Sequence, residues 1–150
     1  MIRVQREDFD PGFELTRLTA GNPAIGGVAS FVGLVRGQAG GEAIGAMTLE
    51  HYPGMTERKL AEIEAEAWQR WSLAASIVIH RYGRLAPGER IVLVGTASAH
   101  RQAALESCAF LIDWLKTEAP FWKLEEAASG SRWVEARSED GEAAGRWRKS

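Results

Sequence analysis

Residues 90–127 read RIVLVGTASAHRQAALESCAFLIDWLKTEAPFWKLEEA and predict three successive elements. Arg90–Ser98 is rich in β-branched side chains, which favours a strand. From about His100 to Ala119 apolar residues recur every three or four positions, which predicts an amphipathic helix. Pro120 marks its end, because the residue before proline is disfavoured in the helical conformation. A second strand is therefore expected at Phe121–Ala127.

The predicted helix has one apolar stripe, which should face the core. Cys108 lies on this stripe and is the only cysteine, so we expect a small buried hydrophobe rather than a nucleophile. A single cysteine also excludes an intramolecular disulfide and any multi-cysteine metal site, and fits a reducing compartment. The stripe consists of Ala104, Leu105, Cys108, Leu111, Ile112 and Leu115.

Strands and helices alternate along the rest of the chain. Two hairpins are predicted, one joining strands 27–35 and 44–52 through the glycine-rich turn Gly37–Gly41, the other joining strands 76–82 and 90–98. Further elements are expected as a strand at 2–4, a helix opened by Asp10-Pro11 and closed by Gly21-Asn22-Pro23, a helix from Met55 to Trp71 and a strand at 132–136.

Length and composition place the chain among ordinary globular proteins. Its 150 residues are 45% hydrophobic, enough for one core that needs no metal or disulfide. We therefore predict the α+β class, with an antiparallel sheet and packed helices in a single domain over residues 1–150. Phe31 and Trp122 are expected in the core. The polar tail from about residue 138 to 150 is expected to be flexible unless a partner orders it.

Charge and hydropathy exclude several classes of protein. The 18 Lys and Arg residues are balanced by 20 Asp and Glu, a net charge of −2, which disfavours a protein that depends on binding polyanions or anionic lipid. No apolar stretch approaches the ~20 residues of a membrane span, and Met1 is followed by charged residues rather than by a signal-peptide core. A cytoplasmic location is expected.

Known catalytic motifs are missing from the sequence. There is no nucleophile elbow, no phosphate-binding P-loop and no dinucleotide-binding glycine fingerprint. His51, His80 and His100 lie in three separate predicted elements, so their spacing predicts no metal site.

Cations stand where predicted elements end. Arg36 follows the strand that ends in Leu34-Val35, His100-Arg101 opens the long helix, Lys116 lies in its last turn, and Lys123 follows the Pro120 bend. We hypothesise that they converge on one pocket for a small anion, because arginine offers a planar fork and a helix start adds positive potential. Crowding would lower the pKa of one lysine and suit it to act as an acid, base or nucleophile.

Each of these residues also has a structural interpretation. A lysine in a last turn stabilises the helix dipole, as Lys116 would. Arg36 beside Gly37 could only solvate the end of a hairpin, and Glu125 could only pair with Lys123, its neighbour on the same face of the strand. Residue spacing alone leaves the two interpretations open.

Six motifs, in order along the chain, resemble the large catalytic subunits of molybdopterin synthase. The run Leu115–Lys123, LKTEAPFWK, is the most particular of them. The others are 31–36 (FVGLVR), 49–55 (LEHYPGM), 80–85 (HRYGRL), 98–101 (SAHR) and 132–136 (RWVEA).

The resemblance implies an α/β hammerhead fold and a homodimer within a heterotetramer that includes two small ubiquitin-like sulfur-carrier subunits. The carrier's C-terminal Gly-Gly, as a thiocarboxylate, would enter the pocket and give up its sulfur. Two such transfers would convert cyclic pyranopterin monophosphate into the dithiolene of molybdopterin, with no metal or organic cofactor. The turn Gly37–Gly41 could shape the mouth of the tail channel or be an idle hairpin tip.

Functional positions of the family can be matched residue by residue. Lys116 resembles the essential catalytic lysine and Lys123 the second one, while Arg137 resembles an arginine that reaches the neighbouring pocket of the dimer. Leu124 departs from the family, whose members often carry a further lysine there. The remaining expected substrate contacts are Leu34, Val35, Arg36, His100, Arg101 and Glu125.

Two other classes of function compete with this one. A non-catalytic module that binds a ubiquitin-like protein would share the tail channel without needing the lysine pair. An RNA- or nucleotide-binding domain would use the same cations, but the negative net charge and the lack of a basic stripe disfavour it.

Overall fold

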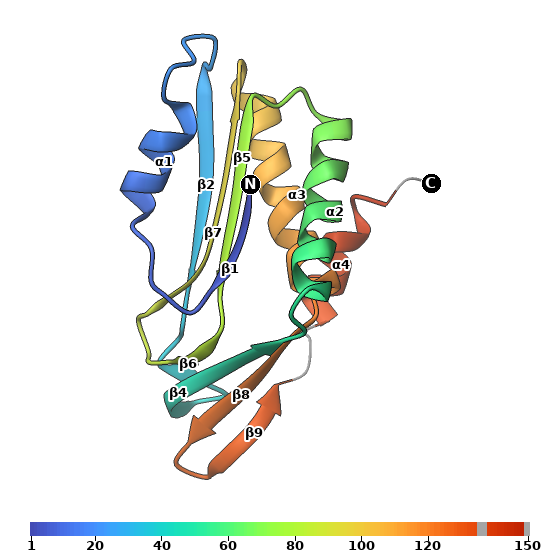
Figure 1. The fold of residues 1–150 in the computed structure, drawn as a ribbon. Helices are drawn as coiled ribbons and strands as arrows, with labels where there is room; N and C mark the ends of the chain where they lie inside the picture. The colour runs from blue at the N-terminus through green and yellow to red at the C-terminus, as the bar shows by residue number, and fades with distance from the viewer. Residues whose placement is uncertain (135–137, 149–150) are drawn as a thin grey trace.

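The computed structural model describes residues 1–134 and 138–148. Its strands form two sheets (Figure 1). The first sheet has the order β1 (Ile2–Gln5), β5 (Ala75–Arg81), β7 (Arg90–Ser98), β2 (Gly27–Leu34). The second has the order β3 (Gln38–Ala39), β4 (Glu42–His51), β8 (Phe121–Ala127), β9 (Gly130–Val134), with β6 (Gly83–Leu85) also paired to β4.

One of the two predicted hairpins is confirmed and the other is wrong. β5 and β7 pair antiparallel as expected. However, β2 pairs with β7 while β4 pairs with β8, so the chain changes sheets between β2 and β4. The turn at Gly37–Gly41 instead makes the short β3–β4 hairpin, in which Gly40 and Gly41 both have positive φ, as a two-residue turn requires. Pairing with the next strand in sequence is the commoner outcome, but here β2 pairs with β7 along its whole length, from Gly27 to Leu34.

Most strand pairs are antiparallel, as predicted, but β1 lies parallel to β5. A parallel pair needs a long crossover, and the chain between β1 and β5 supplies one with room for two helices. The class is α+β, as the sequence predicts.

Helices cover both faces of the first sheet (Figure 1). α1 (Pro11–Thr19) packs on β5 and β7, and α2 (Met55–Arg70) and α3 (Arg101–Glu118) cover the other face. Because both faces are covered, the central strands are almost continuously buried. The main core includes Leu60, Val78, Val94, Phe110 and Leu111.

The predicted stripe of α3 is largely correct. Ala104, Cys108, Leu111 and Leu115 are buried, and burial raises the pKa of the Cys108 thiol to about 11. Leu105, however, is 60% exposed, and Phe110 is buried instead because Trp71 and Trp147 cover its ring.

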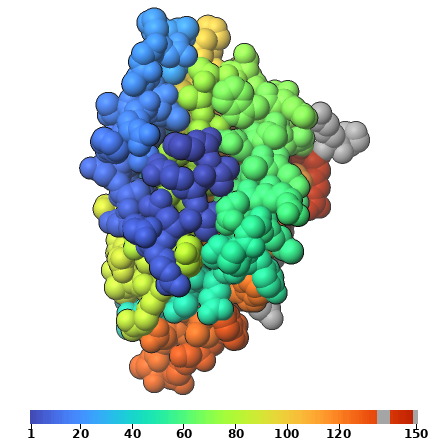
Figure 2. Space-filling model, viewed as in Figure 1, coloured from blue at the N-terminus to red at the C-terminus, as the bar shows by residue number. Residues whose placement is uncertain are grey.

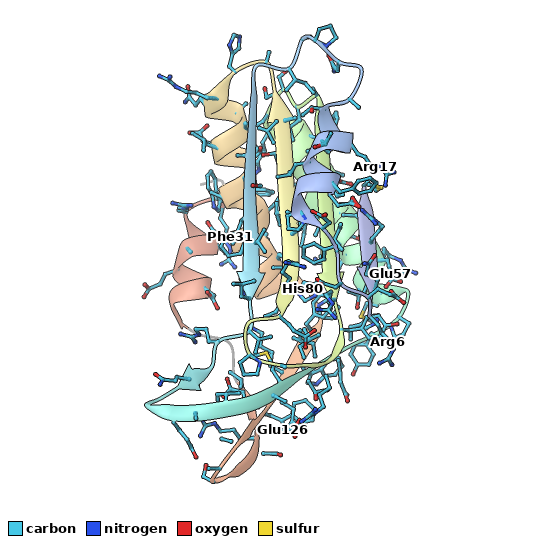
Figure 3. The ribbon with its side chains drawn as sticks, turned by 90° about the vertical axis from the view of Figure 1, so that its left-hand side faces the viewer. Arg6, Arg17, Phe31, Glu57, His80 and Glu126 are labelled. Atoms are coloured by element: carbon cyan, nitrogen blue, oxygen red, sulfur yellow. The ribbon has the colours of Figure 1, made fainter. Side chains whose placement is uncertain are left out.

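The expectation that Phe31 and Trp122 are core residues is wrong. Phe31 lies on β2, which forms an edge of the first sheet, and is 40% exposed (Figure 3). Trp122 is 38% exposed and packs against Tyr52 with ring centroids 4.5 Å apart and the two rings tilted by 54°. A strand residue at an edge or on an uncovered face keeps its side chain in solvent even when it is aromatic.

The C-terminal region contains a helix where a flexible tail was expected. α4 (Ser138–Gly145) packs against α3, and Ala144 is fully buried. The Trp147 indole N–H donates to Asp113 at 2.6 Å. Ala144 and Trp147 thus form an apolar face that packs against the main core. The strand predicted at 132–136 is β9, and positions 135 and 136 of that prediction lie outside the described residues.

The surface view shows how the second sheet extends the molecule. In Figure 2 the β8–β9 hairpin projects at the lower end, below the N-terminal segment and α2.

Within the described ranges, no helix combines the length and the apolar character that crossing a membrane would require.

Candidate active site

The joint between α3 and β8 brings two lysines together. Lys116 lies in the last turn of α3 and Lys123 is the third residue of β8. Between them Ala119 is extended, and its carbonyl accepts from the Phe121 N–H at 2.9 Å. This tight reversal, which Pro120 favours, turns both ammonium groups toward one hollow.

That hollow is a cavity of about 360 Å³ where the two sheets meet. Three cations that the sequence analysis singled out, Arg36, Lys116 and Lys123, line it together. Leu34 and Glu125, also among the expected site residues, line it as well. The remaining lining residues are Met47, Ile91, Phe121, Val134 and Asp140.

Arg36 is held in place by the loop between β6 and β7. The Val35 N–H donates to the Glu89 carbonyl at 2.9 Å, and the Gly88 N–H donates to the Val35 carbonyl at 2.8 Å. These two bonds fix the backbone immediately before Arg36. Val35 is therefore a buried core residue that anchors its neighbour rather than a lining residue of the pocket.

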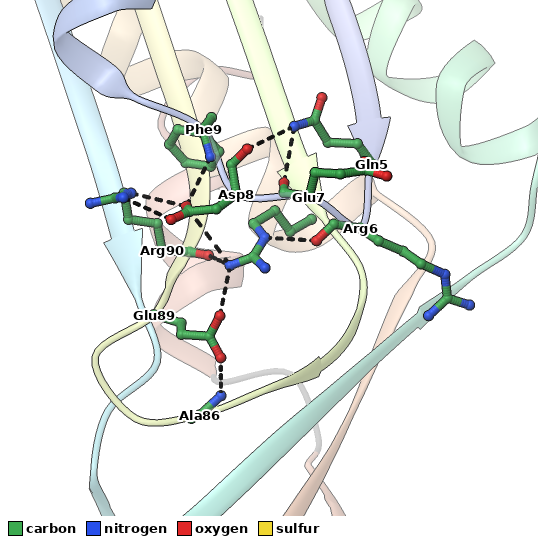
Figure 4. Close-up of polar contacts among 9 residues, drawn as sticks. Gln5, Arg6, Glu7, Asp8, Phe9, Ala86, Glu89 and Arg90 are labelled. Carbon is green, nitrogen blue, oxygen red and sulfur yellow. Dashed lines mark hydrogen bonds and ion pairs between the residues drawn. The ribbon is translucent and has the colours of Figure 1, made fainter.

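A buried guanidinium, that of Arg81, stabilises this loop, and Figure 4 labels its partners Arg6, Glu89 and Arg90. Arg81 donates to the carbonyls of Arg6 at 3.0 Å and Arg90 at 2.9 Å, and to the Glu89 carboxylate at 3.2 Å. The same carboxylate accepts from the Ala86 N–H at 2.6 Å, and this bond is the largest cause that lowers the pKa of Glu89. Since a buried arginine is tolerated only with such partners, the network rigidifies the wall that carries Arg36.

The ammonium group of Lys123 has a lowered pKa. Burial, followed by the ammonium of Lys116, lowers the pKa of Lys123 to about 8, and Arg36 acts in the same direction while Asp140 opposes it. An amine with a pKa near neutrality can serve as a cation or exchange a proton. The crowding expected from the sequence thus falls on Lys123.

His80 lies toward the lower end of the first sheet (Figure 3), near enough to Lys116 and Lys123 for both to act on its pKa. Its ring stacks on Phe121 with centroids 3.7 Å apart and an interplanar angle of 16°, and its Nδ1 is 2.8 Å from the Arg81 carbonyl. Because that carbonyl can only accept, Nδ1 carries the proton. The pKa of His80 is lowered to about 3, chiefly by burial, and the ammonium groups of Lys116 and Lys123 contribute to the same shift. The imidazole is therefore a neutral support of the pocket.

Glu125 is paired with Arg132 rather than with Lys123. It is 7% exposed, and its carboxylate lies 3.5 Å from the Arg132 guanidinium, which also lies 3.6 Å from Glu42. The Glu125 carboxylate is therefore engaged by an arginine outside the lysine pair.

Other expected contact residues lie elsewhere in the single chain. Leu124 lies on the opposite face of β8 from Lys123, since side chains alternate along a strand, and is paired in register with Trp133. His100 and Arg101 stand at the start of α3, about 22 Å from Lys116 at 1.5 Å per residue. Arg137 lies outside the described residues.

Several pocket residues were missed by the sequence analysis. The period-two pattern of β8 places Phe121 on the face of Lys123, so that residue could have been found. Met47, Ile91 and Val134 come from strands whose pairing was unknown, and Asp140 comes from a tail that looked unstructured. Across residues 1–134 and 138–148, His, Cys, Asp and Glu side chains do not assemble into a metal-binding group of three or more.

Fold and pocket together define a class of protein: an α+β domain with a small pocket in which three cationic side chains converge. The comparisons with known proteins agree. The family model described as MoaE protein matches residues 4–118. The molybdopterin synthase catalytic subunit of Pseudomonas aeruginosa is 59% identical over 146 residues, 97% of each chain. The same subunit of Escherichia coli is 56% identical over 146 residues, again 97% of each.

A solved structure gives the same result. The molybdopterin biosynthesis MoaE protein of Burkholderia ambifaria has a TM-score of 0.84 and 51% sequence identity, and the match covers 98% of this chain and 97% of that one. The chain therefore belongs to the MoaE family of molybdopterin synthase catalytic subunits, enzymes of molybdenum cofactor biosynthesis. The hammerhead fold implied by the resemblance is confirmed.

Proposed function

We propose that the pocket of Arg36, Lys116 and Lys123 transfers sulfur to a phosphorylated pterin. The donor is the thiocarboxylated C-terminus of a small ubiquitin-like carrier subunit, and the acceptor is cyclic pyranopterin monophosphate, which gains a dithiolene in two transfers. The observation that carries the proposal is the convergence of these three cations in one cavity, in a chain of this family.

The chemistry explains why three cations are needed. The cyclic phosphate and the thiocarboxylate are both anionic, so binding them side by side requires opposite charge. Opening the phosphate ring places more negative charge on the leaving oxygen, and preorganised cations lower that barrier. Each sulfur first bonds to a pterin carbon as a thioester of the tail, and water then cleaves the bond between that sulfur and the acyl carbon. The sulfur stays on the pterin as a thiolate, and the tail leaves as a carboxylate.

The two lysines take different roles in this proposal. Lys116 acts as general acid–base or as a transient acyl acceptor for the tail, and Lys123 and Arg36 position the phosphate and the tail. Glu125, paired with Arg132, and Leu34 complete the wall of the substrate site.

A second copy of the chain completes the site in this proposal. β2 is an edge strand whose apolar residues Val28 and Phe31 are 43% and 40% exposed. Its first residue, Gly27, is so close to α3 that a Cβ there would lie 3.5 Å from the Arg101 Cα, and its last residue, Leu34, lines the pocket. Antiparallel pairing of two β2 edges would set the start of one strand beside the end of the other. His100 and Arg101 of one copy would thereby approach the pocket of the other, and Arg137 would join them.

The test compares Lys116→Ala with Lys59→Ala, which removes a lysine of α2 that pairs with Glu62 and Glu118 and does not line the cavity. With thiocarboxylated carrier and pterin substrate, Lys116→Ala should form no dithiolene while its circular dichroism and thermal unfolding match the parent chain. Lys59→Ala should keep normal turnover. Near-normal turnover by Lys116→Ala would reject the assignment. Carrier binding without product in the parent chain would favour the non-catalytic module.

A further inference from the structure

The cationic pocket contains a carboxylate that the proposed chemistry does not use. Asp140, on the first turn of α4, lines the cavity with Arg36, Lys116 and Lys123. The other acidic residue of the lining, Glu125, is occupied by Arg132 at 3.5 Å. Asp140 thus brings a negative charge from a separate element to the place where an anion would bind.

The position of Asp140 is set by well-packed contacts further along the C-terminal segment. Ala144 is fully buried, and Trp147 packs its ring against Trp71 and Phe110 at centroid distances of 5.5 and 5.8 Å. Asp113 on α3 accepts from the Trp147 indole at 2.6 Å and pairs with Arg146 at 3.0 Å. With one end of the segment anchored on α3, the other end is held at the pocket.

Asp140 shifts the pKa of Lys123 in the direction opposite to burial and the neighbouring cations. Burial, Lys116 and Arg36 all lower the pKa of Lys123, whereas Asp140 raises it. Among the side chains that the structure describes, the remaining titratable groups around this amine are Glu125 on its own strand, already paired, and His80 on β5, which is neutral. Of these described groups, Asp140 is the carboxylate from another element that favours the ammonium form.

We infer that Asp140 is the resident counter-ion of the pocket: it keeps Lys123 charged while the pocket is empty and competes with an incoming phosphate-like anion for the same cations. Asp140 is a positioning residue in this role, since it acts through Lys123. The inference rests on the proposed function for the identity of the natural anion, but the competition itself depends only on the charges that line the cavity.

The test measures sulfate binding by NMR titration at pH 6.5, where Lys123 is protonated with or without Asp140. Removing the negative charge in Asp140→Asn should tighten sulfate binding by about five-fold, because one like-charge repulsion is lost. Asp140→Glu, which keeps the carboxylate, should bind sulfate with the affinity of the parent chain. Glu142→Gln, the same charge change on an exposed position of α4, should leave the affinity unchanged.

A second readout follows Lys123 itself. In a 13C titration of the lysine side chains, Asp140→Asn should lower the pKa of Lys123 below its value in the parent chain, and Glu142→Gln should not. Unchanged sulfate affinity and an unchanged Lys123 pKa in Asp140→Asn, or equal effects of both variants, would overturn the inference. Neither measurement uses carrier or pterin, so failure of sulfur transfer in the parent chain would reject the proposed function alone.

Discussion

Lys123 is the residue through which pH should act on the pocket. Its pKa is lowered to about 8 by burial first and by Lys116 second, so its charge changes within an accessible pH range. Because the proposed role of Lys123 is to hold an anion, the charged form is the binding form. Anion binding should therefore weaken as pH rises through about 8.

Sulfate, which stays a dianion across this range, makes the prediction testable by titration. Between pH 7 and pH 9 the affinity of the parent chain should fall by about five-fold as Lys123 loses its proton. Lys123→Arg stays charged throughout and should show a nearly flat profile. Parallel profiles for the two proteins would show that another group controls binding.

The sequence predicts which residues form the site only where a motif or a position at the end of an element points to them. Lys116 and Lys123 stand on either side of Pro120, so their convergence was a fair hypothesis. His80 and Asp140 gave no such signal, because the stacking of one and the pocket position of the other depend on elements distant in sequence.

At the scale of elements, the α3–β8 joint depends on its support from β5. Phe121 begins β8, lines the pocket together with Lys116, and has its ring stacked on His80. The Nδ1 hydrogen bond from His80 to the Arg81 carbonyl fixes the imidazole from behind. The angle between the two lysine-bearing elements is thus set by a neutral ring that repels neither ammonium.

The neutrality of His80 predicts how stability changes with pH. The pKa of His80 is about 3 in the folded chain and about 6.5 when unfolded, so between these values the unfolded state binds more protons. The stability that the folded chain gains by holding His80 neutral is fully present above pH 6.5 and is lost as pH falls toward 3. His80→Phe keeps a ring against Phe121 but cannot titrate. From pH 7 to pH 4.5 the parent chain should lose about 2 kcal/mol more unfolding free energy than the variant.

Urea denaturation at the two pH values checks this difference. Equal losses in the two proteins would mean that His80 accepts a proton in the folded chain. A large loss of stability in His80→Phe already at pH 7 would not affect the comparison, since each protein is measured against itself.

Elements were predictable where their own pattern was strong. The stripe of α3 and the β5–β7 pair followed from periodicity and from a short turn. The pairing of β2 with β7 instead of β4 could not be predicted, because several apolar strands of similar composition competed for the same partners. The C-terminal helix was missed because its burial depends on Ala144 and Trp147 fitting between distant helices.

At the scale of the whole molecule, the two ends of α3 point to different sites. Lys116 lines the pocket of its own chain, while His100 and Arg101 stand at the opposite end of the helix. If all of them contact substrate, as the family resemblance implies, the complete site requires two copies. The exposed β2 edge is the surface proposed for that contact.

Mixing two inactive variants tests this arrangement. Lys116→Ala destroys a chain's own pocket, and Arg101→Ala removes what that chain would lend to its neighbour. In randomly mixed dimers half the molecules would be hybrids with one intact pocket of two, so activity should recover to about a quarter of the parent level. Activity no higher than that of either variant alone would place Arg101 outside the site of the partner.

The most direct test of the pocket is a crystal structure of the chain soaked in phosphate. One phosphate should lie in the cavity at the α3–β8 joint, within hydrogen-bond distance of Arg36, Lys116 and Lys123 together. Phosphate bound elsewhere, with that cavity empty and the two ammonium groups directed away from each other, would show that these cations do not form an anion site.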